Sequence, residues 1–140
     1  MADTLHLQVI TPDKKLVDEQ TDQVQIPGKS GYLGILPGHA PLITELAIGE
    51  ISYNVRGSMQ VIAVSWGFAE VLPNRVTILA DTAERAEDIN VQRAEQAKAK
   101  AQEELRNPSQ DMDYDAVNAA LRRAEVRLDV AGKAGARAGH

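Results

Sequence analysis

His39 is a candidate catalytic residue in "YLGILPGHAPLI", Tyr32 to Ile43, a stretch that sets one histidine, two glycines and two prolines among large apolar residues. A hydrolase would need a nucleophile and an orienting carboxylate beside it. Ser30 and Glu45 are close in sequence, but no G-x-S-x-G motif is present, and Ser65 lies in "VSWG". We therefore expect the chain not to be an enzyme. The stretch is then either a buried turn or a surface that contacts a partner.

Two other patterns are candidates for ligand binding. The acidic run "DMDYD" at 111–115 lacks the glycine and the final glutamate of a calcium loop, so it is expected to cap a helix. The run "GKSGYLGILPG" at 28–38 lacks the spacing of a phosphate-binding loop, and no helix is expected behind it. Its glycines are expected to supply positive φ in tight turns. The chain has no cysteine, which excludes disulfides and thiolate chemistry.

A basic face is expected on the last helix of the chain. Arg123 and Arg127 are four residues apart and share a helical face, and Arg122 lies beside that face. Such a face can pair with an acidic protein surface or with phosphate. The alternative is an ordinary solvated face, because Glu125 and Asp129 offset part of the charge.

The elements that position these residues differ between the two parts of the chain. From residue 4 to about 82 apolar and polar residues alternate, as in "TLHLQVI", which predicts β-strands. Turns are expected at 56–58 and 72–76. Short strands separated by turns every 8–12 residues are typical of an all-β sandwich or barrel.

After Asp81 the pattern becomes helical. Residues 90–107 contain no glycine or proline and are rich in alanine, with Asn90 as a predicted N-cap. Pro108 ends this helix, and Asp113 or Asp115 is expected to cap a second one. The fold class is therefore α+β: an N-terminal sandwich, residues 1–84, followed by a two-helix hairpin, residues 85–140. The glycines at 132, 135 and 139 predict a frayed C-terminal tail.

Each predicted helix carries one apolar stripe on an otherwise charged surface. The two stripes are Val91, Ala94, Ala97, Ala101 and Leu105, and Val117, Leu121, Ala124, Leu128 and Ala131. A buried leucine or isoleucine contributes about 1.5–3 kcal/mol, whereas a methyl group contributes ~0.8 kcal/mol. The hairpin is therefore expected to consist of stiff helices on a weak, alanine-rich seam, and to be able to detach without unfolding the rest of the chain.

Composition narrows the classes of partner. The formal net charge of the 140 residues is -5, and there is no basic stripe with interleaved aromatics, which argues against nucleic-acid binding. No apolar run approaches the roughly 18 residues that span a bilayer, and the N-terminal residues do not form a secretory signal. The expected partner is a protein.

Two long runs of the chain carry a family resemblance. "GYLGILPGHAPLI" and "VSWGFAEVLPNRVTILADTAERAEDIN", followed by an alanine-rich helical hairpin, resemble the epsilon subunit of the rotary F-type ATP synthase. The resemblance covers essentially the whole chain in order.

The resemblance implies a non-catalytic central-stalk subunit that helps couple proton flow to ATP synthesis. The sandwich would bind the gamma subunit and sit on the ring of c subunits, and the hairpin would insert among the alpha and beta subunits and inhibit ATP hydrolysis. The implied rotor contacts are Gly31, Tyr32, Leu33, Pro37, His39 and Leu42. The implied contacts with beta are Arg122, Arg123 and Arg127. The protein would be peripheral, on the cytoplasmic face of a plasma or thylakoid membrane, and would meet the membrane only through the complex.

ATP sensing by the hairpin is the alternative function. Some bacterial members bind ATP through a pattern I/L-D-x-x-R-A with two arginines on the second helix. Here the pattern is "INVQRA", Ile89 to Ala94, in which Asn90 replaces the aspartate. The basic positions of the pattern are matched by Arg93, Lys100, Arg123 and Arg127. No cofactor is required, and ATP would be a regulatory ligand.

Overall fold

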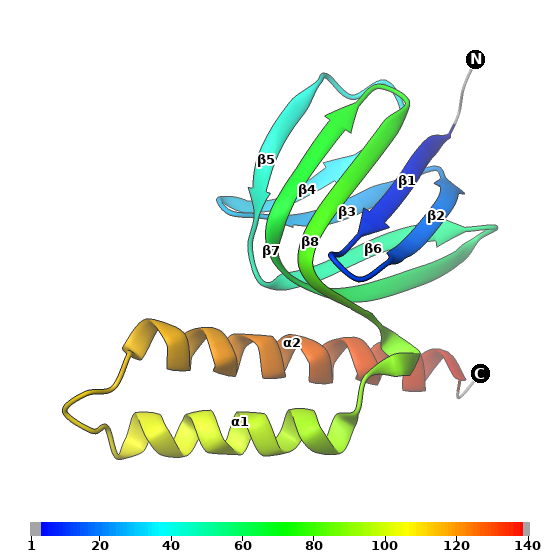
Figure 1. Ribbon diagram of the computed structural model, residues 1–140. Helices are drawn as coiled ribbons and strands as arrows, with labels where there is room; N and C mark the ends of the chain where they lie inside the picture. The colour runs from blue at the N-terminus through cyan, green and yellow to red at the C-terminus, as the bar shows by residue number, and fades with distance from the viewer. Residues whose placement is uncertain (1–3, 139–140) are drawn as a thin grey trace. The chain divides into compact units, whose positions relative to one another are not determined.

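The chain folds into two compact units, one that ends at Glu84 and one that begins at Arg85. A computed structural model describes residues 4–138, and the side chains of residues 4–133 (Figure 1). The first unit contains eight strands: β1 (Leu5–Ile10), β2 (Lys15–Thr21), β3 (Val24–Gly28), β4 (Gly31–Ile35), β5 (Leu42–Leu46), β6 (Gly49–Val55), β7 (Ser58–Leu72) and β8 (Arg75–Arg85). The second contains η1 (Ala86–Asp88), α1 (Val91–Arg106) and α2 (Tyr114–Ala138).

The strands form one sheet that folds over on itself. Their order is β2-β1-β8-β7-β5-β3-β4, and β6 pairs with both β3 and β7. The pair β1–β8 is parallel, whereas β1–β2, β3–β4, β5–β7 and β6–β7 are antiparallel. β7 bends, so that its first half pairs with β6 and its second half with β5 (Figure 1). The predicted all-β N-terminal part is confirmed.

The core of this unit is made by the residues that alternate inward along each strand. Leu5, Leu7 and Val9 of β1 are fully buried, and so are Ile51 and Tyr53 of β6. Each large aliphatic side chain buried in this way contributes about 1.5–3 kcal/mol. The predicted turn at 56–58 is also found: Arg56 and Gly57 both have positive φ, 53° and 79°, and join β6 to β7 as a two-residue hairpin turn.

A bulge in β7 shifts the alternation by one residue. Ile62 and Val64 are buried before it, whereas Ala69 and Val71 are buried after it. Between them Trp66 has φ 53° and Gly67 has φ 129°. A Cβ on Gly67 would lie 2.0 Å from the carbonyl oxygen of Leu79 on β8. Only glycine fits this close approach of two strands.

The two helices α1 and α2 begin at capping residues that the sequence predicts. The side chain of Asn90 accepts a hydrogen bond from the backbone N–H of Arg93 at 3.0 Å and starts α1. The carboxylate of Asp113 accepts from the N–H of Ala116 at 3.1 Å and starts α2. Asp113 is thus the cap, and Asp115 lies inside the first turn. Of the helices in the described residues, none is long and apolar enough to cross a membrane.

The apolar stripes differ from the prediction in both helices. In α1 the buried residues are Ala94 and Ala101, while Val91 and Ala97 are exposed, so the stripe is narrower than expected. In α2 the expected residues are buried or half-buried, but Val126 and Val130 are buried as well: 4% and 0% exposed.

The additional pair lies on the opposite side of α2 from the expected stripe, because Val126 follows Ala124 by about 200° at 100° per residue. α2 therefore buries two faces, and η1 is one of the segments that pack against it. α2 also continues through Gly132 as far as Ala138. Of the predicted tail, only residue 139 and His140 lie outside the described residues.

Candidate docking surface

The loop between β4 and β5 is held in place by its backbone. Gly38 has φ 90°, and its N–H donates to the carbonyl of Pro73 in the β7–β8 turn at 2.7 Å. The N–H of His39 donates to the carbonyl of Leu36 at 3.1 Å. The His39 ring donates through Nδ1 to the carbonyl of Ala40 at 2.7 Å. Both hydrogen bonds found for His39 in the described part of the chain therefore end on the backbone of its own loop.

Strand β4 presents Tyr32 across the outer face of the sheet. Its hydroxyl accepts a hydrogen bond from the N–H of Glu50 at 3.1 Å, and a Cβ on Gly49 would lie 2.7 Å from that hydroxyl. The ring therefore reaches over β3 to the start of β6 while remaining 47% exposed. Leu33 points the other way and packs against the core. Of the residues expected to contact the rotor, Leu33 thus belongs to the interior.

An exposed apolar surface lies on β4, β5 and the second half of β7. We call the exposed residues Tyr32, Leu42, Ile43 and Phe68 the apolar surface; Leu42 shares its side of β5 with the buried Val71, whereas Ile43 and Phe68 lie on the other side. Tyr32 and Leu42 line one hollow, with a volume of about 240 Å³. Ile43 and Phe68 lie on the paired strands β5 and β7 and are 72% and 54% exposed. Leu36 and Leu79 are exposed as well, 59% and 53%.

The chain segment that contributes Tyr32, Leu42 and Ile43 to this surface is also poor in charge. Residues 31–43 contain no Asp, Glu, Lys or Arg, although 25% of the whole chain is charged. Glu45 and Glu70 lie next to the apolar side chains, because Phe68 pairs with Glu45 and Ile43 with Glu70. Exposed apolar residues bordered by charge are typical of a protein contact.

The alternating pattern of the sequence does not predict that Phe68, Trp66 and Leu79 are exposed in this region. In "SWGFAEV" a strict alternation would place Phe68 with Ile62 and Val64 in the core. The bulge at Trp66–Gly67 reverses that alternation and turns Phe68 outward. The signal in the sequence is the glycine within an apolar strand, which often marks a bulge.

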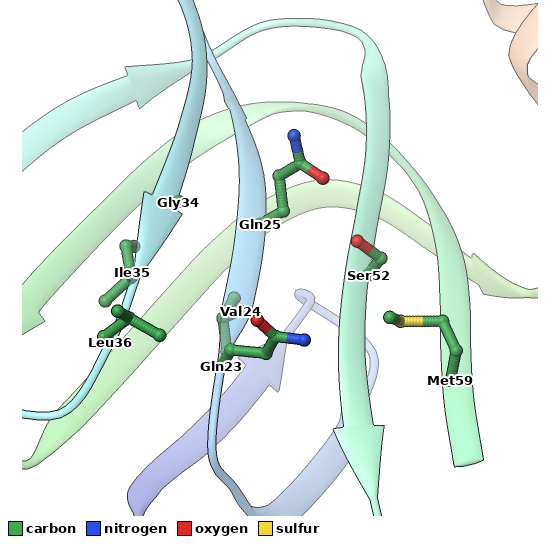
Figure 2. A pocket seen from close by; sticks show the side chains of 8 residues that line it. All are labelled: Gln23, Val24, Gln25, Gly34, Ile35, Leu36, Ser52 and Met59. Carbon is green, nitrogen blue, oxygen red and sulfur yellow. The ribbon is translucent and has the colours of Figure 1, made fainter. Parts of the chain in front are cut away.

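A second hollow lies beside β4 on the outer face of the sheet (Figure 2). Its volume is about 320 Å³. Its lining residues are Gln23, Val24, Gln25, Gly34, Ile35, Leu36, Ser52 and Met59. It therefore offers amide and hydroxyl groups between apolar walls and contains no charged side chain.

The basic residues of the helical unit do not all share one face. Arg123 and Arg127 are half-buried on α2, whereas Arg122 is exposed. Arg93 is exposed in the first turn of α1, and the antiparallel hairpin places that turn alongside the C-terminal part of α2 (Figure 1). Asn90, which replaces the aspartate of the ATP pattern, uses its side-chain oxygen to cap α1. Among the described residues no group of three or more His, Cys, Asp or Glu is arranged to hold a metal ion.

One charged cluster of the sandwich lies on β1 and β2. Asp18 receives hydrogen bonds from the His6 ring and from the Lys15 ammonium group, the latter at 3.1 Å. These hydrogen bonds, His6 first and Lys15 second, lower the pKa of Asp18 below its ordinary value of 3.8. The pairs are solvent-exposed.

Comparison with known proteins identifies the family. Residues 4–86 match "ATP synthase, Delta/Epsilon chain, beta-sandwich domain", and residues 87–132 match "ATP synthase, Delta/Epsilon chain, long alpha-helix domain". The ATP synthase epsilon chain of Koribacter versatilis is 62% identical over 105 residues, which cover 75% of this chain and 74% of the relative. That of Solibacter usitatus is 50% identical over 133 residues, covering 95% and 99%.

A solved structure supports the same fold. A chain in the structure of the Euglena gracilis mitochondrial ATP synthase, described as OSCP/F1/c-ring, aligns with a TM-score of 0.70 and 22% identity, covering 100% of this chain and 84% of that one. At this identity the likeness shows the fold alone. The two family matches together span almost the whole sequence, and the chain therefore belongs to the epsilon-chain family of ATP synthases.

Proposed function

We propose that this chain is a non-catalytic subunit of the ATP synthase rotor, which docks on other rotor subunits through its sandwich and restrains ATP hydrolysis through its helices. The observation that carries the docking role is the apolar surface: four large apolar side chains are exposed on β4, β5 and β7, and three of them lie within a run of 13 residues, 31–43, that contains no Asp, Glu, Lys or Arg. Exposed apolar area of this kind is costly in water and is stabilised when a partner covers it.

The proposed partners of the sandwich are the gamma subunit and the ring of c subunits. The solved structures that share the fold come from assemblies whose titles name F1, the c-ring and the central stalk. The backbone hydrogen bonds that fix the loop at Gly38 and His39 give a pre-formed contact, so docking has little ordering entropy to overcome. The protein would then be peripheral, held at the membrane only through the complex.

The proposed regulatory role rests on the helical unit. On the α1 side its seam is built from small residues, Ala94 and Ala101, which bury little area per residue. A weak seam allows the hairpin two arrangements separated by a few kcal/mol. In the extended arrangement Arg122, Arg123 and Arg127 would be available to acidic groups of the beta subunit.

The docking role is tested by placing an additional charge on the apolar surface. Ile43→Glu should weaken association with a gamma-containing catalytic complex by about tenfold or more, because a carboxylate would be desolvated against apolar groups. The measurement is a binding titration with the complex depleted of this chain. Val91→Glu is the matched control, since Val91 is 44% exposed at the start of α1, outside the apolar surface. Equal affinities for the two variants, with both folded, would exclude this surface as the docking site.

A further inference from the structure

The two ends of the sheet differ in how they are protected. Edge strands expose unpaired backbone groups, and proteins usually guard them with charged side chains, proline or bulges. The edge strand β2 carries Lys15, Asp18 and Glu19. The opposite edge strand β4 reads "GYLGI" and contains no charge and no proline. Among the described strands, β4 is paired on one side only, with β3.

The register of β3 and β4 fixes which backbone groups of β4 point outward. A two-residue turn joins Gly28 to Gly31, so this pair is hydrogen-bonded and the next pair, Pro27 with Tyr32, is not. Pro27 has no N–H, and its carbonyl accepts instead from Ala47 on the other side of β3. The N–H and C=O of Tyr32 therefore point away from β3, and those of Gly34, two residues on, do the same.

The hollow beside β4 lies next to these groups. Gly34 pairs with Gln25, which pairs in turn with Ser52, so the three residues form one row across the outer face of β4, β3 and β6. Nothing lies within 4 Å of the position where a Cβ of Gly34 would be. The 320 Å³ hollow thus begins where the edge strand lacks a side chain (Figure 2). A large side chain on an added strand commonly fills the space beside an edge glycine.

We propose that β4 accepts an extended segment of a neighbouring ATP synthase subunit as an additional strand. The N–H and C=O groups of Tyr32 and Gly34 form the backbone hydrogen bonds. An uncharged, large apolar side chain opposite Gly34 packs into the hollow between Leu36 and Gln25. This inference rests on the proposed docking function and specifies its geometry.

The observations favour a different subunit over a second copy of this chain. Self-pairing of two five-residue β4 strands would bury far less than the roughly 1,200 Å² of a specific interface. A larger partner that adds a strand at β4 can also cover Leu42 and Ile43, which lie on β5 at the other end of the same loop. Because residues 31–43 contain no Asp, Glu, Lys or Arg to pair with a buried charge, they favour a partner segment without charge at the contact.

The experiment compares amide hydrogen exchange in the free full-length chain with exchange in the reconstituted gamma-containing catalytic complex. The N–H groups of Tyr32 and Gly34 should exchange rapidly in the free chain and at least about 100-fold more slowly in the complex. The N–H groups of Leu33 and Ile35, which face β3, should be protected in both states.

A substitution tests the outward N–H of Gly34 directly. Gly34→Pro deletes one outward donor without touching the ladder to β3, and proline is tolerated at such an edge position. It should weaken binding to the complex by about tenfold or more, because the partner carbonyl loses its donor. Gly34→Ala keeps the N–H and is the control, expected to bind within about threefold of the unchanged chain. Protection of the amide of Ile35 shows that Gly34→Pro still folds.

Three results would contradict the proposal. If the complex forms while Tyr32 and Gly34 exchange as fast as in the free chain, strand addition is wrong and the docking function stands. If the free chain is a dimer in which these amides are already protected, the occupant of the edge is a second copy. If the unchanged chain does not bind the complex, both the docking function and this inference fail.

Discussion

Gly67 and Gly34 of the sandwich have different roles, because the space around each residue differs. Gly67 has φ 129° and meets the backbone of Leu79 and Ala80 at 2.0–2.9 Å from a notional Cβ. Gly34 has open space at the same atom. The bulge at Gly67 is what turns Phe68 toward solvent, so one residue without a side chain determines whether part of the apolar surface exists.

We predict that Gly67→Ala destabilises the sandwich by at least about 2 kcal/mol, because it combines backbone strain with a clash against backbone atoms that cannot move aside. Gly34→Ala is the matched control and should change the free energy of unfolding by less than about 1 kcal/mol. Urea denaturation of the full-length chain measures both. A Gly67→Ala variant as stable as Gly34→Ala would mean that the two strands are not as close as described.

Asp18 gives a prediction about pH. Its folded-state pKa is lowered by hydrogen bonds from His6 and Lys15, so its contribution to stability is present above the unfolded value of about 3.8 and is lost as pH falls through the lower folded value. Asp18→Asn should therefore lower the melting temperature slightly at neutral pH, and the difference should shrink below about pH 4. If the difference in melting temperature instead grows as the pH falls, the pKa of Asp18 is not lowered in the folded chain.

At the scale of elements, the sequence predicts those structures in which local pattern and burial agree. The alternation in β1 and β6, the turn at Arg56–Gly57 and the cap at Asn90 are all found in the structure. Each depends on residues within a few positions of one another. The sequence also resolves the change from period two to helical period near residue 82.

Two features depend on contacts distant in sequence, and the pattern alone does not predict them. At the bulge in β7, Gly67 lies against the backbone of Leu79 on β8, more than ten residues away. α2 has a second buried face, with Val126 and Val130, and it packs against η1 as well as against α1. A single apolar stripe was expected because the neighbours of a helix cannot be read from its own sequence.

The helical caps give a prediction at this scale. Asn90→Ala removes the side-chain acceptor for the N–H of Arg93 and should destabilise α1 by about 1 kcal/mol. The effect should appear as faster amide exchange in the first turn of α1, with the strands of the sandwich unchanged. If exchange also accelerates in β1 and β8, the two units do not open independently.

The seam between α1 and α2 gives a related prediction. Because the buried residues of α1 are alanines, amides of both helices should exchange faster than those of β1, β7 and β8 in the isolated chain. Replacing the buried Ala124 by Gly, which removes a methyl from the seam and lowers helix propensity by about 1 kcal/mol, should widen that gap. Helices as well protected as the strands would contradict a weak seam and, with it, a hairpin that can rearrange.

At the scale of the whole molecule, the two units divide the proposed work. The unit that ends at Glu84 has its own core of large aliphatic residues and carries the apolar surface, so it should fold and dock without the helices. The unit that begins at Arg85 has a seam of small residues and a basic second helix. Docking and inhibition should therefore be separable by a single truncation.

We predict that a chain ending at residue 86 keeps its affinity for the gamma-containing complex within about threefold, while ATP hydrolysis by that complex rises at least about twofold over the complex with the full-length chain. The rise is expected because the segment proposed to reach the beta subunit is absent, and the retained affinity because the apolar surface and the edge of β4 are intact. Steady-state hydrolysis and binding are measured on the same preparations. Substituting Arg122, Arg123 and Arg127 together by alanine in the full-length chain should give part of the same rise, because their charges would make the contact with beta. Unchanged hydrolysis in the truncated chain, with binding preserved, would leave the sandwich as a docking module and remove the inhibitory role from the helices.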